Sequence, residues 1–244
     1  MTTKQVYTED KIIHQILTSW EGKDTAGHDM DDSYRKWVPH DGTVYYSIPT
    51  TAPNDEGFGE AAGFDAAMMT PYKAKMAGEA FELWDDLIAL NLTPTTATGG
   101  NIITLAYSST TSDNESYARP FLTGTYPFYF IDKERIWFSD KWPGFTSDSD
   151  VKYGNYSFSA YLHEIGHSLG LSHPGTYNFS PSGILKYDIN AEYAQDTRQN
   201  TIMSYYGGWE HHQIGTTSFG NPIYSPWEFN RYSDIDGKAN LNAK

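Results

Sequence analysis

The stretch Tyr161–Pro174 reads YLHEIGHSLGLSHP and contains the spacing H-E-x-x-H-x-x-G-x-x-H. On a helix, His163 and His167 lie one turn apart on the same face, so their ring nitrogens can both reach one ion at about 2.0–2.1 Å. Gly170 can turn the chain out of the helix through a positive φ, which lets His173 return as a third ligand. The stretch therefore predicts a zinc site formed by a helix and the turn after it.

The number of ligands points to catalysis. Three neutral histidines leave the fourth coordination position to water, whose pKa zinc lowers from about 15.7 to roughly 7. Glu164 follows the first ligand and is the candidate general base, which takes a proton from this water and later passes one to the leaving amine. The alternative is an ordinary amphipathic helix with unrelated histidines. A chance match of all the fixed positions is improbable, so we interpret the motif as a metal site.

A second segment, Asp196–Tyr206, reads DTRQNTIMSYY and contains the methionine turn expected beneath such a zinc site. Together with the long histidine motif, it makes the chain resemble the metzincin metalloproteases. The residues Ser172–Gly175 (SHPG) and Met203–Tyr205 (MSY) resemble the serralysin family specifically. The expected helices and strands also follow the serralysin order, and the resemblance extends over about residues 5–206.

The resemblance implies a role for each motif residue. The implied zinc ligands are His163, His167 and His173. Glu164 would be the general base, and Met203 would form the apolar floor of the site. In serralysins the tyrosine two residues after the turn methionine can bind zinc at rest and swing away to stabilise the oxyanion, which gives Tyr205 both roles. The alternative for Tyr205 is a tyrosine packed in the core.

We expect an α+β, zincin-like metzincin fold over a single catalytic domain of residues 1–244. Its upper lobe, about residues 1–173, would hold a twisted, mostly parallel sheet with an antiparallel edge strand and two long helices. Its lower lobe, about residues 174–244, would be irregular and contain the methionine turn. Hydrophobic patterning predicts helices over residues 8–19 and 71–91, and strands over residues 43–48, 101–106, 126–130 and 135–138.

The last of these strands is expected to matter for substrate. We predict that Ile136, Trp137 and Phe138 form an edge segment beside the cleft. An edge strand can hydrogen-bond an extended peptide along its main chain without requiring a particular side chain. Broad specificity would follow.

Composition limits the other functions. A formal charge of −14 and a sequence pI near 4.8 argue against binding nucleic acid or an anionic membrane surface. The sequence has no run of 18 apolar residues and no cysteine, which excludes a spanning helix, disulfides and thiolate catalysis. Calcium could bind Asp29–Asp32 or Asp148–Asp150, but no motif supports it and solvated loops explain both runs better. We expect a monomer.

The ends of the sequence lack two expected features. Residues 1–9 show no charged segment followed by an apolar run, so we expect no signal peptide; secretion as an extracellular bacterial protease is implied by the resemblance alone. A small protein inhibitor is implied in the same way. Residues 207–244 contain neither the acidic-apolar helix nor the G-G-x-G-x-D repeats usual after a serralysin catalytic domain. The chain would be an isolated catalytic part, a processed fragment or a short relative.

Two other functions stay open. A zinc-dependent protein could bind peptides without cutting them, although this would require a lost base and Glu164 is present. A structural zinc domain would need a fourth protein ligand, which Tyr205 could supply as a phenolate.

Overall fold

The computed structural model describes residues 4–24, 26–53, 60–97, 100–111, 115–178, 185–206, 213–216 and 222–224. The helices in these ranges are α1 (Glu9–Thr18), α2 (Pro71–Asp85), α3 (Tyr156–Ser168) and α4 (Tyr187–Asn190), with 3-10 turns at Glu60–Gly63, Pro143–Phe145 and Asp148–Asp150. The strands are β1 (Ser19–Lys23), β2 (Asp29–Asp31), β3 (Tyr34–Trp37), β4 (Thr43–Ser47), β5 (Asn91–Pro94), β6 (Ile102–Ser108), β7 (Ser116–Thr125), β8 (Phe128–Ser139), β9 (Gln213–Thr216) and β10 (Pro222–Tyr224). None of these helices has the length and apolar character needed to cross a membrane.

A six-stranded sheet dominates the described structure. Strands β5, β4, β6 and β8 lie side by side and parallel, with Leu105 of β6 opposite Ile136 of β8. β3 runs parallel to the first part of β8. β7 pairs antiparallel with β8, from Ser116 opposite Phe138 to Thr125 opposite Phe128. The prediction of a mostly parallel sheet with an antiparallel edge strand is confirmed, and β7 is that edge.

The strand expected to bind substrate lies elsewhere in the sheet. Ile136, Trp137 and Phe138 belong to β8, lie between β6 and β7, and have buried side chains. The prediction that they form an edge is wrong because β8 is one continuous strand of 12 residues with a partner on each side, not two short strands. β7 mixes polar residues with Tyr117, Phe121 and Leu122, and it contains Pro120, which lacks an N–H and is tolerated in edge strands.

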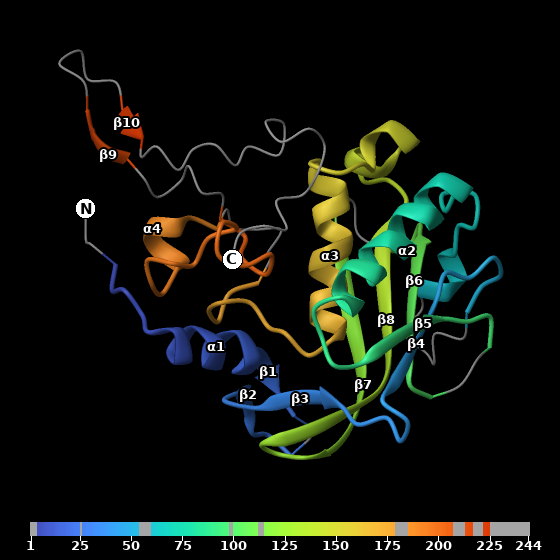
Figure 1. Ribbon diagram of the computed structural model, residues 1–244, viewed down its shortest axis with the longest axis horizontal. Coiled ribbons are helices and arrows are strands. Elements are labelled where there is room, and N and C mark those ends of the chain that lie inside the picture. Colours follow the sequence, from blue (N-terminus) through green and yellow to red (C-terminus); the bar gives the residue numbers. More distant parts are fainter. Residues whose placement is uncertain are drawn as a thin grey trace.

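The main core lies between the sheet and two helices. α2 and α3 pack on one face of the sheet (Figure 1), and Phe81 and Phe158 from these helices share one buried cluster with Ile103, Leu105 and Tyr107 of β6. The remaining residues of β6 are buried as well. A strand apolar on both faces is typical of the centre of a parallel sheet. This core fixes α3, and with it the histidine motif, against the sheet.

The sequence also predicted too long a second helix. α2 begins as expected, with Thr70 as N-cap and Pro71 at the first position. It ends at Asp85, and Leu87, which continued the apolar pattern, is 72% exposed. Residues 91–94 instead form β5, and the Asp85 carboxylate accepts a hydrogen bond of 2.6 Å from the Leu92 amide. Pairing with β4 competes successfully with helix propagation.

The N-terminal segment joins the sheet-bearing part to the chain after the histidine motif. Gln5 forms a parallel bridge with Tyr193, whose ring stacks on Tyr7 at 4.6 Å. Figure 1 shows α1 below the orange segment that carries α4. The described residues from 174 to 206 contain only α4 as regular structure, which agrees with an irregular lower lobe. The limits of the lobes and the single domain stay predictions, because most of residues 207–244 lies outside the described part.

Candidate zinc centre

α3 places the first two histidines on one face. The ring centroids of His163 and His167 are 4.6 Å apart and the rings are nearly perpendicular, at 87°. At the end of the helix, the Trp37 indole N–H donates to the Ser168 carbonyl at 2.7 Å. This bond satisfies one of the carbonyls that every helix C-terminus leaves without a partner. The helix end is therefore fixed where it must deliver the third ligand.

Gly170 makes the turn that brings His173 back. Its φ is +97°, and two backbone bonds complete a Schellman motif: Leu171 N–H to the Gly166 carbonyl at 3.0 Å and Gly170 N–H to the His167 carbonyl at 2.9 Å. A Cβ at Gly170 would lie 2.2 Å from the Arg35 carbonyl oxygen of β3. The predicted positive φ is confirmed, and close approach to β3 is a second reason for glycine.

The loop before His173 is held by α1 and by Ser19, the first residue of β1. The Ser172 amide donates to the Ile16 carbonyl at 2.6 Å, and the Ser172 hydroxyl donates to the Ser19 carbonyl at 2.5 Å. Ser172 is 2% exposed. The orientation of the third ligand thus depends on a helix about 150 residues away in the sequence, which explains why α1 belongs to the site.

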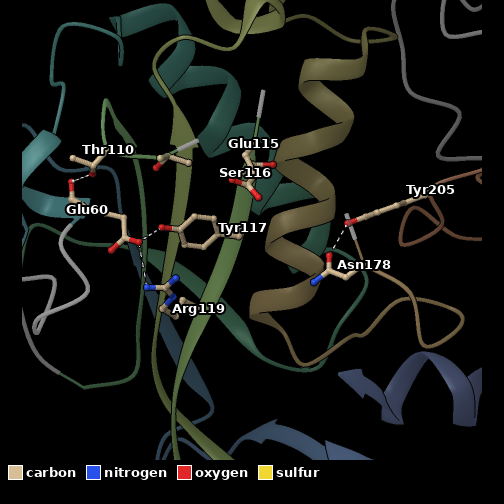
Figure 2. A pocket seen from close by; sticks show the side chains of 9 residues that line it. Glu60, Thr110, Glu115, Ser116, Tyr117, Arg119, Asn178 and Tyr205 are labelled. Carbon is tan, nitrogen blue, oxygen red and sulfur yellow. Dashed lines mark hydrogen bonds and ion pairs between the residues drawn. The ribbon is translucent and has the colours of Figure 1, made fainter. Parts of the chain in front are cut away.

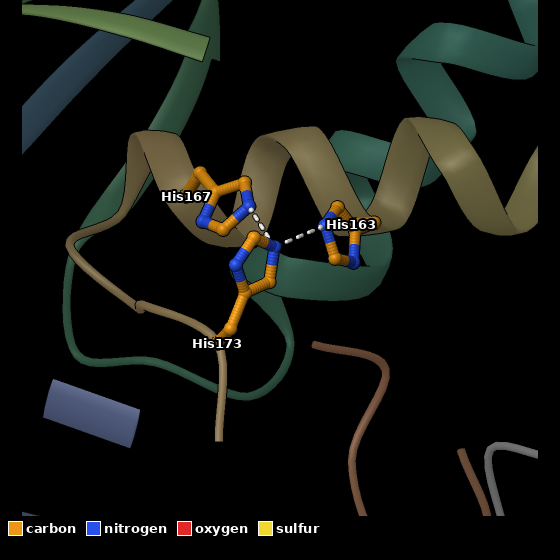
Figure 3. Close-up of side chains that lie close together, drawn as sticks. All are labelled: His163, His167 and His173. Carbon is orange, nitrogen blue, oxygen red and sulfur yellow. Dashed lines mark hydrogen bonds between the residues drawn. The ribbon is translucent and has the colours of Figure 1, made fainter. Parts of the chain in front are cut away.

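The three imidazoles converge with defined tautomers (Figure 3). Each Nδ1 lies within hydrogen-bond distance of a carbonyl oxygen: His163 of Ile202 at 2.9 Å, His167 of Leu171 at 2.7 Å, and His173 of Tyr177 at 2.8 Å. Since a carbonyl can only accept, each Nδ1 carries the proton. Burial lowers the pKa of all three rings, that of His167 to about 4. The rings are therefore neutral, with bare Nε2 atoms.

These bare nitrogens lie close together. The His173 Nε2 is 3.1 Å from the His167 Nε2 and 3.3 Å from the His163 Nε2. Tetrahedral zinc with bonds of about 2.0–2.1 Å would hold its nitrogen ligands about 3.3 Å apart. Lone pairs facing one another at such distances repel unless a cation lies between them. The donor set fits zinc, and His163, His167 and His173 form the zinc-binding triad.

Glu164 lies beside the edge strand. Its side chain is 5% exposed and its Oε1 accepts a hydrogen bond of 2.8 Å from the Ser116 hydroxyl of β7. Burial raises the pKa of this carboxyl to about 7, while Ser116 and the Ala118 amide oppose the shift. Glu164 therefore lies beside both β7 and the zinc ligand that precedes it, His163.

The methionine turn lies directly under the ligands. Met203 is fully buried, and a Cβ at Gly166 would be 2.5 Å from its sulfur. The carbonyl of the preceding Ile202 is the one that accepts from His163. The turn therefore contacts α3 through an apolar side chain and a ligand through its backbone, and the absence of a side chain at Gly166 permits the approach.

Tyr205 projects beside the ligands. Its ring centroid is 4.5 Å from that of His173 and 5.6 Å from that of His163. Its hydroxyl donates to the Asn178 side chain at 3.1 Å (Figure 2). The structure therefore places Tyr205 next to the zinc triad, as expected, with its hydroxyl directed to Asn178. Its roles as zinc ligand and oxyanion donor stay predictions.

A polar cavity of about 340 Å³ adjoins the centre. Tyr205 and Asn178 line one side of it and Ser116 of β7 lines the other, with α3 between them in the view of Figure 2. At its far end the Glu60 carboxylate accepts from Tyr117 and from Arg119. Thr110, Thr111 and Glu115 complete the lining. The cavity extends along β7 from Ser116 to Arg119.

The sequence analysis assigned no role to three residues near the zinc centre: Gly166, Ser116 and Asp196. Gly166 had a signal, because glycine inside a helix costs about 1 kcal/mol relative to alanine and indicates close packing. Ser116 had none, since only the sheet order brings β7 beside Glu164. Asp196 was within the quoted methionine segment but was assigned no role.

The calcium candidates have structural explanations. Asp29–Asp31 forms β2, and the Asp150 carboxylate accepts from the Ser147 amide at 2.9 Å at the start of a 3-10 turn. Within the described residues, the histidine triad is the group of three or more potential ligands close enough to share a metal ion. Calcium binding is not shown.

The fold and the site define a class: zinc metalloproteases built on a mostly parallel sheet, an active-site helix and a methionine turn. Comparison with known families agrees, because the model described as Matrixin matches residues 64–207, more than half of the chain. Serralysin B of Dickeya chrysanthemi is 29% identical over 222 residues. Serralysin of Photorhabdus luminescens is 31% identical over 219 residues, and metalloprotease AprA of Pseudomonas entomophila is 31% identical over 210 residues.

The chain belongs to the matrixin family of metalloproteases and is serralysin-like. The alignments cover 87%, 83% and 83% of this chain, respectively. They cover only 40%, 41% and 38% of those relatives. The sequence therefore spans about two fifths of the length of the relatives it matches.

Proposed function

We propose that this chain is a zinc endopeptidase that hydrolyses extended protein substrates with broad side-chain specificity. The observation that carries the proposal is the convergence of three neutral Nε2 atoms beside Glu164, which itself contacts the edge strand. A merely structural zinc site would close with a fourth protein ligand. The fourth candidate, Tyr205, directs its hydroxyl to Asn178 instead.

β7, Glu164 and Tyr205 each have a role in the proposed reaction. β7 would bind the substrate main chain as an added strand, which requires no particular side chain. Bound zinc would act as a Lewis acid toward the scissile carbonyl and would lower the pKa of a water molecule. Glu164 would accept the proton of the attacking water at a carboxylate oxygen and release a proton to the leaving amine. The Tyr205 hydroxyl would donate a hydrogen bond to the carbonyl oxygen as negative charge develops there.

The substrate-binding edge strand of this proposal is β7, in place of residues 136–138 of β8. The cavity along β7 reaches Ser116, which bonds Glu164, so a peptide on this strand would pass the general base. The Ser116 and Ala118 contacts also hold the Glu164 carboxylate at the strand. Main-chain recognition at this position supports broad specificity.

The proposal extends to setting and partners. We infer a secreted, monomeric protein that acts on proteins or peptides, with a small protein inhibitor as a further partner, because the serralysin likeness implies these properties. The net charge of −14 disfavours nucleic acid as a partner.

Protein degradation with and without zinc tests the function. Purified protein should degrade casein, lose this activity when a chelator removes zinc, and regain it when one equivalent of zinc is restored. A peptide library should be cut at many different sequences. A zinc-loaded protein that binds peptides but leaves them intact would support the non-catalytic alternative and contradict the proposal.

A further inference from the structure

Asp196 is a fully buried acidic residue that the proposed reaction does not use. Its Oδ1 accepts two hydrogen bonds, from the Tyr177 hydroxyl at 2.9 Å and from the Ser204 hydroxyl at 2.7 Å. Tyr177 follows the third zinc ligand, and Ser204 lies in the methionine turn. We propose that Asp196 is a positioning residue that holds the His173 loop and the methionine turn in one fixed arrangement around the zinc.

One connection reaches the metal ligand. The Tyr177 carbonyl accepts the hydrogen bond from His173 Nδ1 at 2.8 Å. The Tyr177 ring also stacks on the His173 ring, with centroids 5.4 Å apart and planes within 12°. Tyr177 is 4% exposed, and Asp196 is the partner that fixes its hydroxyl end. Such outer partners orient a ligating imidazole and set its tautomer.

The other connection reaches the methionine turn. Ser204 stands between Met203 and Tyr205, and its hydroxyl oxygen also accepts from the Tyr206 amide at 3.1 Å. The Arg198 side chain donates to the Ser204 carbonyl at 3.0 Å. Hydrogen bonds to Asp196, Arg198 and Tyr206 therefore hold the methionine turn at Ser204. Releasing Ser204 would loosen the residues that form the floor of the site and carry the phenolic hydroxyl.

The acceptor oxygen, and not the charge, carries this role. Both hydrogen bonds end on Oδ1, while Oδ2 is buried without a hydrogen-bond partner among the described residues. A buried charge with a bare oxygen destabilises the fold. A side-chain amide could place its oxygen where Oδ1 lies and accept the same two bonds without charge. Asp196→Asn should therefore preserve the positioning role, whereas Asp196→Ala should abolish it.

Zinc release provides the test. It rests on the proposed zinc centre but needs no turnover, so it can succeed even if the wild type cleaves no peptide. Wild type, Asp196→Ala, Asp196→Asn and the exposed control Asp188→Ala are loaded with one zinc and mixed with excess chelating indicator. We expect Asp196→Ala to lose zinc about 10-fold faster or more. Asp196→Asn should stay within about threefold of wild type, and Asp188→Ala should be unchanged.

Two results would overturn the inference. Zinc loss from Asp196→Ala at the wild-type rate would show that Asp196 does not position the ligand. Equal zinc loss from folded Asp196→Asn and Asp196→Ala would show that the acceptor oxygen is not what matters.

Two milder variants keep the test valid if Asp196→Ala does not fold. Tyr177→Phe and Ser204→Ala each remove one donor to Asp196 and leave the carboxylate in place. We expect Tyr177→Phe to accelerate zinc loss, and Ser204→Ala to lower kcat more than it changes zinc loss. In a double-mutant cycle, Tyr177→Phe should accelerate zinc loss as much in the Asp196→Asn background as in wild type. The reason is that the asparagine oxygen still accepts the hydrogen bond that Tyr177 donates. Wild-type zinc loss and kcat in both single variants would contradict the inference.

Discussion

The two halves of the zinc centre are built by different means. α3 delivers His163, Glu164 and His167 through helix geometry, and backbone bonds within the helix hold them in place. The chain after Gly170 delivers His173, and its described residues from 171 to 206 have only the short α4 as regular structure. There, side chains such as Asp196 hold the loops together across the sequence. The first half is local in origin, and the second depends on tertiary contacts.

This difference suggests how each half should respond to substitution. Changes on α3 should remove a chemical function and leave the frame intact. Changes after the helix should alter zinc retention, turnover or stability through geometry. The predictions below run from the largest expected effect to the smallest.

Glu164→Gln should lower kcat by about 10³-fold, within the 10²- to 10⁴-fold range of general acid–base catalysis, because an amide cannot take a proton from water. Zinc binding should persist, since all three ligands remain. Peptidase assays on protein with a measured zinc content of one equivalent check this. Substantial activity in the metal-loaded variant would remove Glu164 from the role of base.

His173→Ala should weaken zinc binding by more than about 100-fold, which exceeds the effect typical of outer partners. Folding should change less, because most of the core lies between the sheet, α2 and α3. Zinc per protein after dialysis and a thermal unfolding curve give both quantities. An unchanged stoichiometry would show that His173 is not a ligand.

Tyr205→Phe should lower kcat by about 10²-fold and alter KM little, because an oxyanion donor contributes about 2.7–4 kcal/mol in the transition state only. The ring would still pack against His173, so stability should hold. Steady-state kinetics decides the matter. A kcat within twofold of wild type would favour the alternative of a packed tyrosine.

Gly170→Ala should destabilise the fold by more than about 3 kcal/mol. A positive φ alone costs about 1–3 kcal/mol for other residues, and the new Cβ would lie 2.2 Å from the Arg35 carbonyl. Gly166→Ala provides the contrast on α3: its Cβ would meet the Met203 sulfur at 2.5 Å, but a side chain can move and alanine favours the helix. Denaturant unfolding measures both. A larger loss for Gly166→Ala would contradict the comparison.

Asp196 should make stability depend on pH. Burial raises its pKa to about 6, with Glu192 adding to the shift and Ser204, Tyr177 and Lys4 opposing it. Since the folded state holds the proton more tightly, the contribution of Asp196 is fully present below about pH 4. It falls as pH rises through 6, by at most about 3 kcal/mol.

The asparagine variant isolates this contribution. The free energy of unfolding of Asp196→Asn minus that of wild type should increase between pH 4 and pH 7, with zinc removed from both proteins. A difference that stays constant over this range would show that the carboxyl does not titrate as expected.

Parts of the fold were accessible from the sequence because their signals are local. The Thr70–Pro71 start of α2 and the buried run of β6 follow from capping and apolar patterning. The end of α2 was not accessible, since pairing of Leu92 with β4 ends the helix pattern early. β7 was missed because its polar and apolar residues do not alternate regularly and Pro120 interrupts them, which gives a weak strand signal.

The sequence by itself determined the metal, its three ligands and the turn between the second and third. Those features depend on residue type and on spacing within 11 residues, which helix geometry and one positive φ convert directly into positions. Only the tertiary structure decided that β7 is the edge, that Ser116 bonds Glu164, and that Asp196 joins the His173 loop to the methionine turn. These contacts join segments separated by up to 48 residues, and no local propensity specifies which polar group is buried against which partner.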